Sequence, residues 1–354
     1  MKNLAFFEAA TPYWRDFHNS LAKDGFEIVY LTSEFESYCK GVESQLNFSP
    51  LIINKSKNTW LFSRLLKLIR DRNPRIVISI EYSLLTFQLW LIKVIFGYNY
   101  RLVTRCDDSI EMLEHPLTKT HKVASKFISR LVDDVVLCDK RTFDYYRKKY
   151  GKGIFFPIVS DDSVFRKELE DSLQIACRFR KEYSLSGKKV ILFVGRLVQV
   201  KNIELLFDAL KLAKIEDSVV VIVGDGPLRN TLQEKAERCF SRVIFTGTEY
   251  GLNVKAWYSI ADIFVLPSFH ETFGAVVPEA LMSGCYSLVS NAAGSAPLVQ
   301  KGKTGDVFSP YSSQELADKL LFAINIISQE YGMRPSLMPQ SYSEYYQELL
   351  QSLS

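Results

Sequence analysis

The sequence predicts an α/β protein of two domains, each with a parallel sheet flanked by helices. Short apolar runs alternate with amphipathic segments over residues 4–158, and a second series of the same kind begins near residue 190. This alternation is typical of doubly wound sheets. The length of 354 residues, with 47% hydrophobic and 24% charged residues, suits two domains with ordinary cores.

The first series predicts an N-terminal domain over residues 1–165. Its candidate strands are 4–8, 27–32, 51–54, 75–80, 101–105, 134–138 and 154–156, and helical stretches separate most of them. Residues 161–187 are polar and rich in turn formers, without a long apolar run. We therefore expect the domain boundary inside this segment.

The second series predicts a C-terminal domain over residues 185–330. Its candidate strands are 190–194, 219–223, 243–245, 263–266 and 287–289. A helical stripe follows the first strand, formed by Ile203, Leu206, Leu210 and Ala213. A later stripe marks another helix, formed by Leu316, Leu320, Ile324 and Ile327. Residues 342–353 again have a helical pattern.

Composition excludes several classes of protein. Six scattered cysteines without a C-x-x-C pair indicate buried free thiols in a reducing cytoplasm, not disulfides or a zinc site. The longest apolar stretch, residues 84–96, is interrupted by Gln88 and Lys93 and is shorter than the roughly 20 residues of a membrane span. No signal peptide is expected. We expect a cytoplasmic protein that does not cross a membrane.

Charge is distributed unevenly along the chain. Residues 1–160 carry 24 Lys and Arg against 17 Asp and Glu, and residues 161–354 carry 20 against 23. A basic half suits either contact with an anionic membrane or phosphorylated acceptor, or a solvated surface. The cationic amphipathic stretch 60–70 has two matching interpretations, a membrane-interface helix or a core-facing helix of the first domain. Peripheral contact with the inner face of the cell membrane therefore stays open.

Two glutamates follow the predicted strand 263–266. Glu271 lies on the loop, and Glu279 lies just inside a short helix that is expected to begin at Pro278 and end at Gly284. Loops at the carboxyl ends of strands bind ligands in open α/β sheets, and helix N-termini favour anions such as phosphate. This stretch is a candidate site for a nucleotide-linked substrate.

With Phe273-Gly274 between them, Glu271 and Glu279 resemble the E-x7-E motif of the retaining glycosyltransferases of family 4. Because two glutamates at this spacing are common, the order of the preceding segments carries the resemblance. These segments are FVGRL at 193–197 with Lys201-Asn202, VGDGPL at 223–228, FTG at 245–247 and ADIFVLPS at 261–268. The resemblance implies the GT-B fold, two Rossmann-like doubly wound domains facing a central cleft. It also implies that a last helix, 340–354, packs back on the N-terminal domain.

The resemblance assigns roles to the residues of this stretch. Arg196 and Lys201 are implied to clamp the donor diphosphate, where an Arg fork and a Lys charge stabilise the leaving nucleoside diphosphate. Glu279 is implied to bind the ribose hydroxyls. Glu271 is implied to face the transferred sugar, beside the backbone N–H groups of Thr272, Phe273 and Gly274.

Two further turns are implied to approach the nucleotide. One contains Gly224, and the other contains Gly247 and Thr248. The first turn also begins like a dinucleotide-binding fingerprint, but Arg229 replaces the third glycine of G-x-G-x-x-G, which disfavours an NAD enzyme.

The N-terminal half matches the family less well. Residues 8–14 lack the glycine pair that the family usually has after its first strand. Where many members have a histidine, this chain has Cys106-Asp107-Asp108. Asp107 is the candidate for contacting the sugar or acceptor, and its alternative interpretation is a helix N-cap or loop carboxylate. His18, His115 and His121 have no ligand spacing, and His270 neighbours Glu271.

The resemblance implies a retaining hexosyltransferase that takes a sugar from a nucleotide-diphosphate donor, with UDP favoured. The acceptor would be a glycan or lipid-linked molecule in surface polysaccharide or lipopolysaccharide assembly. No D-x-D motif or metal cluster is evident, so we expect a metal-independent enzyme with no cofactor and no nucleic-acid partner. Two alternatives stay open, a GT-B nucleotide-sugar hydrolase or epimerase, and a catalytically degenerate nucleotide-binding subunit.

Overall fold

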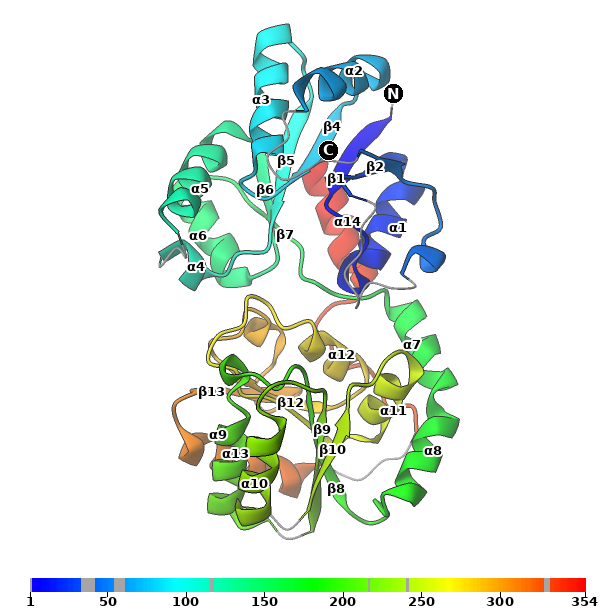
Figure 1. The fold of residues 1–354 in the computed structure, drawn as a ribbon, viewed down its shortest axis with the longest axis vertical. Helices are drawn as coiled ribbons and strands as arrows, with labels where there is room; N and C mark the ends of the chain where they lie inside the picture. Colours follow the sequence, from blue (N-terminus) through cyan, green and yellow to red (C-terminus); the bar gives the residue numbers. More distant parts are fainter. Residues whose placement is uncertain are drawn as a thin grey trace. The chain divides into compact units, whose positions relative to one another are not determined.

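The computed structural model describes residues 2–32, 42–53, 61–114, 118–215, 217–239, 242–327 and 332–354. The chain divides into two compact units (Figure 1). Unit 1 consists of Met1–Ser160 with Ser343–Ser354, and unit 2 of Asp161–Tyr342. Each unit has its own parallel sheet, so the predicted α/β class with doubly wound sheets is confirmed.

Unit 1 contains a seven-stranded sheet in the order β3-β2-β1-β4-β5-β6-β7. Its strands are β1 Asn3–Phe7, β2 Phe26–Tyr30, β3 Leu51–Ile52, β4 Ile76–Ile80, β5 Arg101–Cys106, β6 Asp134–Leu137 and β7 Ile154–Phe155. The central strands read as apolar runs because helices cover both faces of the sheet. All seven expected strands are present, and their ends differ from the expected ones by at most two residues.

Helices follow the strands of unit 1. They are η1 Pro12–Trp14, α1 Arg15–Lys23, η3 Glu43–Gln45, α2 Phe62–Arg72, α3 Leu84–Phe96, α4 Ile110–Glu114, α5 Lys119–Leu131 and α6 Lys140–Tyr150. Local chemistry sets their ends: Ser83 caps the start of α3 by accepting from the Thr86 N–H, and Gly97 ends it in the left-handed conformation.

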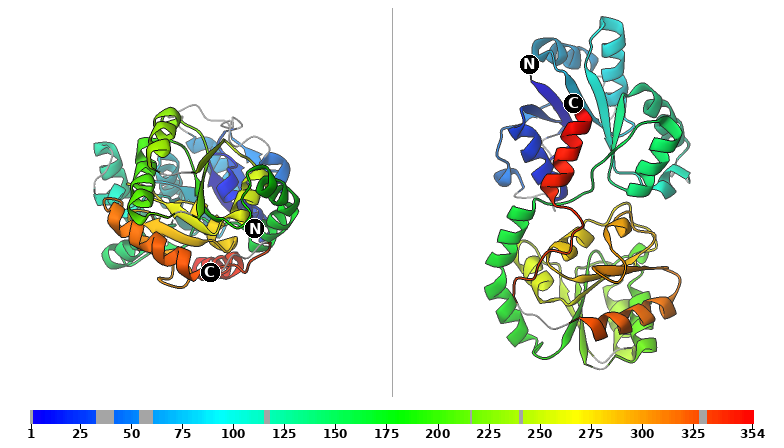
Figure 2. Two further views of the ribbon diagram at one scale, coloured as in Figure 1. Left: turned by 90° about the horizontal axis from the view of Figure 1, so that it is seen from below. Right: turned by 180° about the vertical axis from the view of Figure 1, so that it is seen from behind.

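The last helix, α14 Tyr342–Leu353, forms where the sequence pattern predicts it. Its Tyr346 hydroxyl donates to Asp24 Oδ2 at 2.7 Å, and the Tyr345 ring lies 6.0 Å from that of Phe155, centroid to centroid. The end of the chain therefore packs among the elements of unit 1 (Figure 2).

Unit 2 contains a six-stranded sheet in the order β10-β9-β8-β11-β12-β13. Its strands are β8 Lys189–Val194, β9 Ser218–Val223, β10 Val243–Gly247, β11 Ile263–Leu266, β12 Tyr286–Ser290 and β13 Gly305–Phe308. The first five were expected, and β13 was missed. As a four-residue edge strand with two half-buried residues, β13 lacks the apolar run that marks the others.

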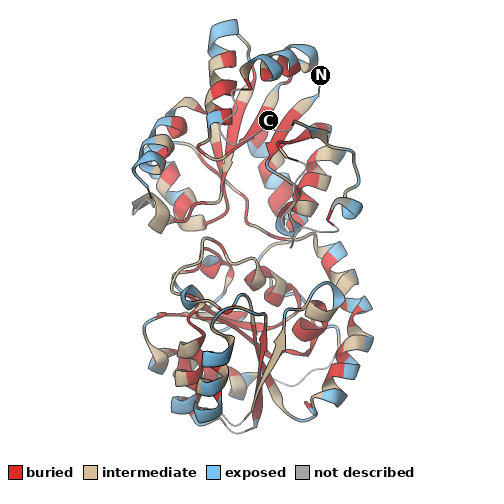
Figure 3. Cartoon of the chain, in the orientation of Figure 1, coloured by how far each residue is buried: buried red, intermediate tan, exposed pale blue. Residues whose placement is uncertain are grey.

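Helices of unit 2 flank this sheet. They are α7 Asp162–Asp171, α8 Leu173–Glu182, η4 Gln199–Lys201, α9 Ile203–Ala213, α10 Arg229–Cys239, α11 Leu252–Ile260, α12 Val276–Met282, η5 Ala296–Leu298 and α13 Ser313–Ile326. Figure 3 shows buried residues along both sheets and exposed residues on the outer sides of many helices. The stripe over 203–213 forms α9, and the later stripe forms α13, with Ile327 just beyond its end.

Two expectations about unit 2 were wrong. Residues 161–187, expected to be turn-prone, mainly form α7 and α8, because Asp161 caps α7 and a stripe of buried residues runs along both helices: Phe165, Leu169, Ala176 and Phe179. The short helix α12 begins at Val276 and not at Pro278. Proline is tolerated there because N–H groups in the first turn have no partner within the helix.

In both sheets, the chain order reverses at one pair of neighbouring strands. This switch point lies between β1 and β4 in unit 1, and between β8 and β11 in unit 2. Loops from such neighbouring strands leave the sheet in opposite directions, which opens a crevice at their carboxyl ends where ligands bind. Most candidate residues of unit 2 follow these two strands, whereas Gly224 follows β9 and Gly247 and Thr248 lie at the end of β10.

Candidate functional site

The loop after β8 is held to the loop after β11 at the switch point of unit 2. The Phe269 N–H donates to the Val200 carbonyl at 2.8 Å. The buried Asn202 side chain donates to the carbonyls of Pro267 at 3.1 Å and Pro310 at 2.8 Å. Asn202 has a φ of 51°, a left-handed conformation that asparagine tolerates better than most residues. These bonds fix the position of Lys201.

Lys201 Nζ and Glu271 Oε2 form an ion pair across these two loops. Their side chains are 15% and 17% exposed, so both charges are largely withdrawn from water but stay accessible. The structure thus brings together the proposed diphosphate-binding cation and the proposed sugar-facing carboxylate, which lie 70 residues apart in the sequence.

Glycine turns join the ends of β8, β9 and β10. A Cβ atom on Gly224 would lie 1.9 Å from the Gly195 carbonyl oxygen, and one on Gly226 would lie 2.5 Å from that of Leu197. The Gly224 N–H donates to the Gly247 carbonyl at 2.8 Å. Glycine is therefore required at both positions, because these turns pack backbone against backbone.

The loop 271–274 rests on a second loop, residues 292–295, that the sequence did not single out. The Ser295 N–H donates to the Phe273 carbonyl at 2.8 Å, and the Gly294 N–H donates to that of Glu271 at 3.1 Å. A Cβ on Gly294 would lie 2.2 Å from the Thr272 carbonyl oxygen, so glycine is required there. The signal in the sequence was this glycine four residues after the end of strand β12.

The backbone of this loop offers hydrogen-bond donors. The N–H groups of Thr272, Phe273 and Gly274 donate to no other group in the described parts of the chain. The Phe273 side chain is buried, and Gly274 has a φ of +91°. Phe273 therefore anchors the loop, and its backbone, not its ring, is the group available to an anion.

Glu279 lies on α12 and contacts two residues of α11 that the sequence did not predict. Its Oε2 accepts from the Tyr258 hydroxyl at 3.0 Å, and its Oε1 lies 3.4 Å from Lys255 Nζ. Lys255 is only 7% exposed, and its ammonium also lies 3.6 Å from Glu168 Oε2 and 3.8 Å from the ring centroid of Phe165. Residues 255–260 are all buried in the structure. The overlooked signal in the sequence was the lysine at the start of this stretch.

Arg196 and Thr248 are exposed on the loops after β8 and β10. Within the described residues, the Arg196 guanidinium makes no hydrogen bond or ion pair. The structure therefore places Arg196 on the same sheet edge as Lys201 but does not bring it into contact with Glu271 or Glu279.

Asp107 belongs to unit 1, where it follows β5 at the sheet edge. Its Oδ2 lies 3.7 Å from Arg105 Nη2, and its N–H donates to Glu81 Oε1 at 3.4 Å. The neighbouring Asp108 is buried and pairs with His121, Nε2 to Oδ2, at 2.9 Å. Asp107 therefore belongs to a group of three carboxyls, those of Glu81, Asp107 and Asp108, with the Arg105 guanidinium and the His121 ring beside them.

Glu81, directly after β4, was not singled out from the sequence. Desolvation, together with the charges of Asp107 and Asp108, raises the pKa of Glu81 to about 8. Its φ of 52° is a conformation that non-glycine residues rarely adopt. Such a combination of backbone strain and a shifted pKa is common at functional sites.

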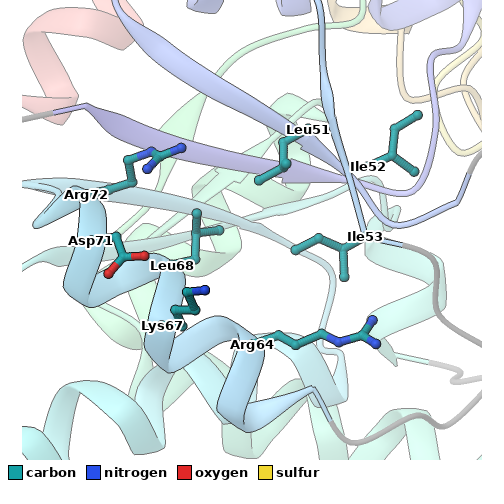
Figure 4. A pocket seen from close by; sticks show the side chains of 8 residues that line it. All are labelled: Leu51, Ile52, Ile53, Arg64, Lys67, Leu68, Asp71 and Arg72. Carbon is teal, nitrogen blue, oxygen red and sulfur yellow. The ribbon is translucent and has the colours of Figure 1, made fainter.

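A pocket of about 610 Å³ lies in unit 1 between α2 and β3 (Figure 4). Its wall combines apolar and charged side chains: Leu51, Ile52, Ile53, Arg64, Lys67, Leu68, Asp71 and Arg72. Most of the cationic stretch 60–70 lies in α2, and Trp60 lies outside the described residues. The buried side chains Leu65, Leu68 and Ile69 show that one face of this helix packs in unit 1.

The remaining candidates are placed as follows. His18 is buried with Nδ1 2.9 Å from the Tyr30 hydroxyl, and burial holds the pKa of its imidazole well below the ordinary value. His115 lies outside the described residues. Cys106, Cys138 and Cys285 are buried free thiols as expected, whereas Cys177 is exposed.

The described residues contain no group of three or more His, Cys, Asp or Glu side chains placed to hold a metal ion. They also contain no helix with the length and apolar character needed to cross a membrane.

Residues 178–330 match the family described as glycosyl transferases group 1. The chain is 27% identical over 252 residues to a 2-deoxystreptamine N-acetyl-D-glucosaminyltransferase of Niallia circulans, covering 70% of this chain and 63% of the relative. It is 38% identical over 126 residues to a GDP-mannose-dependent alpha-mannosyltransferase of Mycolicibacterium smegmatis, covering 36% of this chain and 32% of the relative. The chain thus covers less than two thirds of these relatives.

Among solved structures, HepE of Anabaena in complex with UDP is similar to this chain over its whole length. The TM-score is 0.76 at 16% identity, and the match covers 100% of this chain and 99% of the other. At this identity the likeness concerns the fold. The expected GT-B fold and the resemblance to family 4 are confirmed.

Proposed function

We propose that this chain is a glycosyltransferase that uses a nucleotide-diphosphate sugar, since residues 178–330 match the glycosyl transferases group 1 family and the chain has a GT-B fold. One observation carries the proposal: Lys201 and Glu271 meet at the switch point of unit 2, beside the loop 272–274, whose backbone N–H groups have no partner among the described residues. A cation next to free N–H groups suits a diphosphate, and a carboxylate beside it suits a sugar.

In this proposal unit 2 binds the donor. Arg196 and Lys201 hold the diphosphate, Gly224, Gly247 and Thr248 lie along the nucleotide, and the Thr272 to Gly274 backbone donates to the donor's oxygens. Glu279 accepts hydrogen bonds from the ribose hydroxyls, and its contacts with Lys255 and Tyr258 fix the carboxylate before the ribose arrives. Preorganisation of this kind reduces the entropy that binding costs.

The ion pair implies an order in which Lys201 and Glu271 act when the donor binds. An arriving diphosphate competes with Glu271 for the Lys201 ammonium, which releases the carboxylate toward the sugar. Lys201 then neutralises the charge that grows on the leaving diphosphate, while Glu271 lies near the positive charge that develops at the anomeric carbon. Neither step calls for a metal ion, which is why we propose a metal-independent enzyme.

We propose retention of the anomeric configuration by same-face attack. The bond between the anomeric carbon and the diphosphate oxygen breaks, and a bond to the acceptor oxygen forms on the same face. The acceptor's proton passes to the departing diphosphate oxygen. No enzyme nucleophile is needed, and the charges balance within the substrates.

Unit 1 is proposed to bind the acceptor, with Asp107 contacting the acceptor or the transferred sugar. The raised pKa of the neighbouring Glu81 keeps this side chain mostly protonated near neutral pH. Glu81 would therefore supply a hydrogen-bond donor next to the Asp107 carboxylate. The proposed acceptor is a glycan or lipid-linked molecule of surface polysaccharide or lipopolysaccharide assembly. A lipid-linked acceptor would place the enzyme at the cytoplasmic face of the membrane.

The proposed donor is a UDP-hexose. HepE was solved with UDP, whereas the mycobacterial relative depends on GDP-mannose, so the base is the part of the proposal that most needs a test. The purified chain should be incubated with a panel of UDP- and GDP-sugars and lipid-linked acceptors, with and without EDTA, and the products identified by mass spectrometry.

We expect transfer from a UDP-sugar that survives EDTA and keeps the anomeric configuration. Free sugar or an isomer as the sole product would instead support a hydrolase or epimerase. Nucleotide binding without turnover would support a degenerate subunit, which the missing glycine pair after β1 makes a specific alternative. Loss of activity in EDTA that manganese or magnesium restores would contradict metal independence.

A further inference from the structure

Two aromatic side chains of unit 2 pack against each other close to the Lys201–Glu271 ion pair. Tyr311 lies in the connection between β13 and α13 (Figure 1), and its ring centroid is 5.5 Å from that of Phe269, with the ring planes 32° apart. At 79% exposed, Tyr311 is the most exposed large apolar side chain of the described residues. We call these two rings the aromatic platform.

The backbone beneath the aromatic platform is fixed by hydrogen bonds. The buried Asn202 side chain donates to the carbonyls of Pro267 and Pro310, which holds the loops after β11 and β13 together. The Tyr311 N–H donates to Ser309 Oγ at 3.3 Å. A tyrosine on a fixed backbone offers a large contact area at a low cost in conformational entropy. The exposed ring is therefore suited to binding a ligand.

Short backbone segments join the aromatic platform to the ion pair. Phe269 precedes Glu271 by two residues, which separates their Cα atoms by at most about 7 Å. The Phe269 N–H donates to the carbonyl of Val200, the residue directly before Lys201. Val200 is itself 39% exposed and adds apolar surface beside Lys201. A ligand on the platform would therefore lie next to the place where transfer is proposed to occur.

The chemistry of the aromatic platform matches one face of a sugar ring. The faces of aromatic rings carry partial negative charge, whereas the C–H groups on the face of a pyranose are apolar and weakly positive. The hydroxyl groups at the rim of the sugar need polar partners, and His270, Lys201 and Glu271 are available beside the platform. This combination fits a carbohydrate better than a purely apolar ligand.

We propose that the aromatic platform is a subsite that binds one pyranose ring of the acceptor glycan, in addition to the unit 1 contacts proposed above. The sugar of the donor has to be shielded from water, which would otherwise hydrolyse it, whereas an acceptor chain continues into solvent. The exposed ring of Tyr311 therefore suits the acceptor. The inference rests on the proposed function for this assignment, and it narrows the acceptor to a molecule with a pyranose ring near its reacting hydroxyl.

Binding to the aromatic platform can be measured without donor or turnover. The full chain is labelled with 3-fluorotyrosine, and the fluorine NMR signal that is missing in Tyr311→Phe identifies Tyr311. Lactose, maltotriose and cellotriose are the probes. At least one of them should shift the Tyr311 signal and leave that of Tyr250, which is 71% exposed on the loop after β10, unchanged. No shift with any of the three would contradict the proposal.

Transfer kinetics separate the acceptor from the donor. With a glycan acceptor found in the product screen above, Tyr311→Ala should raise the acceptor KM roughly 3- to 10-fold, the range expected for one aromatic contact. The donor KM and the affinity for the nucleoside diphosphate should stay at the wild-type values. Tyr311→Phe keeps the ring and should behave like wild type. Phe269→Leu keeps an apolar side chain but not the ring, and should raise the acceptor KM less.

Phe322→Ala is the matched control, because it removes another exposed aromatic ring, on α13, and should leave both KM values unchanged. Thermal unfolding followed by circular dichroism excludes loss of structure in each variant. A raised donor KM in Tyr311→Ala would assign the platform to the sugar of the donor and overturn the proposal. Unchanged kinetics would overturn it too, since Tyr311 would then only cover Phe269.

The two measurements also distinguish this inference from the proposed function. If the chain transfers sugar but no probe shifts the Tyr311 signal and Tyr311→Ala has a normal acceptor KM, the subsite is wrong and the proposed function stands. If no donor supports transfer while a probe still shifts the Tyr311 signal, the proposed function is wrong, and the platform binds a carbohydrate for another purpose.

Discussion

In unit 2 the strands beside the switch point, β8 and β11, lead to Lys201 and Glu271, with glycine turns beside them. In unit 1 the corresponding strands, β1 and β4, lead to Glu8 and Glu81, and the neighbouring β5 leads to Asp107 and Asp108. The same sheet topology therefore presents a cation and backbone donors in one unit and a group of carboxyls in the other. Arg196, Lys201 and the unpaired N–H groups of residues 272–274 make the first edge the better match for an anionic diphosphate, whereas Asp107 and Asp108 disfavour one at the second edge.

This difference shows why topology alone does not identify a ligand. A parallel sheet brings the loops together, but the residues on those loops decide which charge the crevice accepts. The contrast is compatible with the proposed function, in which unit 2 binds the donor and unit 1 the acceptor, since a neutral hydroxyl acceptor suits a carboxyl-rich edge. Four changes test this contrast.

The largest effect is expected from the diphosphate clamp. Lys201→Ala removes a charge-assisted contact worth about 1.5–3 kcal/mol, which should weaken nucleoside diphosphate binding roughly 10- to 150-fold. Arg196→Ala should weaken binding in the same direction. Calorimetry with the cognate diphosphate measures this, and Lys211→Ala, an exposed lysine on α9, is the control. Unchanged affinity in both clamp variants would show that the cations have another role.

The second effect separates the two glutamates. Glu279→Gln should mainly raise the donor KM, because the ribose hydroxyls are held equally in the ground and transition states. Glu271→Gln should mainly lower kcat, because charge develops at the sugar. We expect changes of about tenfold, or roughly 1.4 kcal/mol, in each.

Binding of the bare nucleoside diphosphate checks the assignment, since this ligand has a ribose but no sugar. Its affinity should fall in the Glu279 variant and stay near wild type in the Glu271 variant. The opposite pattern would mean that the two carboxylates have exchanged roles, and no effect from either would remove this loop from the active site.

A smaller effect is expected from Lys255→Met, which keeps the length and apolar contacts of the side chain but removes its charge. Glu279 then loses one of its two partners and is held by Tyr258 alone. The donor KM should rise severalfold, on the order of 1 kcal/mol, while kcat stays within about twofold. Restoration by Lys255→Arg would support positioning through charge, whereas equal losses of kcat and thermal stability would indicate a purely structural lysine.

The smallest change concerns Glu81 in unit 1. Burial raises the pKa of Glu81 to about 8, so the folded state holds this proton more tightly than the unfolded chain does. Its stabilising contribution is therefore complete below about pH 4.5 and is lost as the pH rises toward 8. Asp107 and Asp108 reinforce this behaviour, and Arg105 opposes it.

Glu81→Gln cannot titrate and should lack this contribution to the pH dependence. Urea unfolding at several pH values between about 5 and 8.5 should show the variant gaining stability relative to wild type as the pH rises. Parallel curves for the two proteins would contradict the raised pKa. Transfer activity of the same variant should also lose any alkaline limb that depends on Glu81.

Sequence patterns were sufficient for the alternating strands and helices, because the apolar period of a buried strand or helix is a local property. They also located the stretch around Glu271 and Glu279, where the order of short motifs is specific. They failed where the signal was weak or depended on context. The four residues of β13 and the mixed composition of α7 and α8 resembled loops, although Asp161 and the stripe from Phe165 to Phe179 specify helices.

The contacts of the candidate site were decided by tertiary structure. No local pattern places Lys201 against Glu271 or makes Lys255 the partner of Glu279, because these pairs are separated by 70 and 24 residues. They meet because β8 and β11 are neighbours in the sheet and because α11 packs beside α12. Likewise, the sequence shows that α3 is apolar, but only its packing reveals that Thr86 and Gln88 face inward. The reason is that spacing along the chain determines which side chains share a face, whereas strand order and helix packing determine which faces meet.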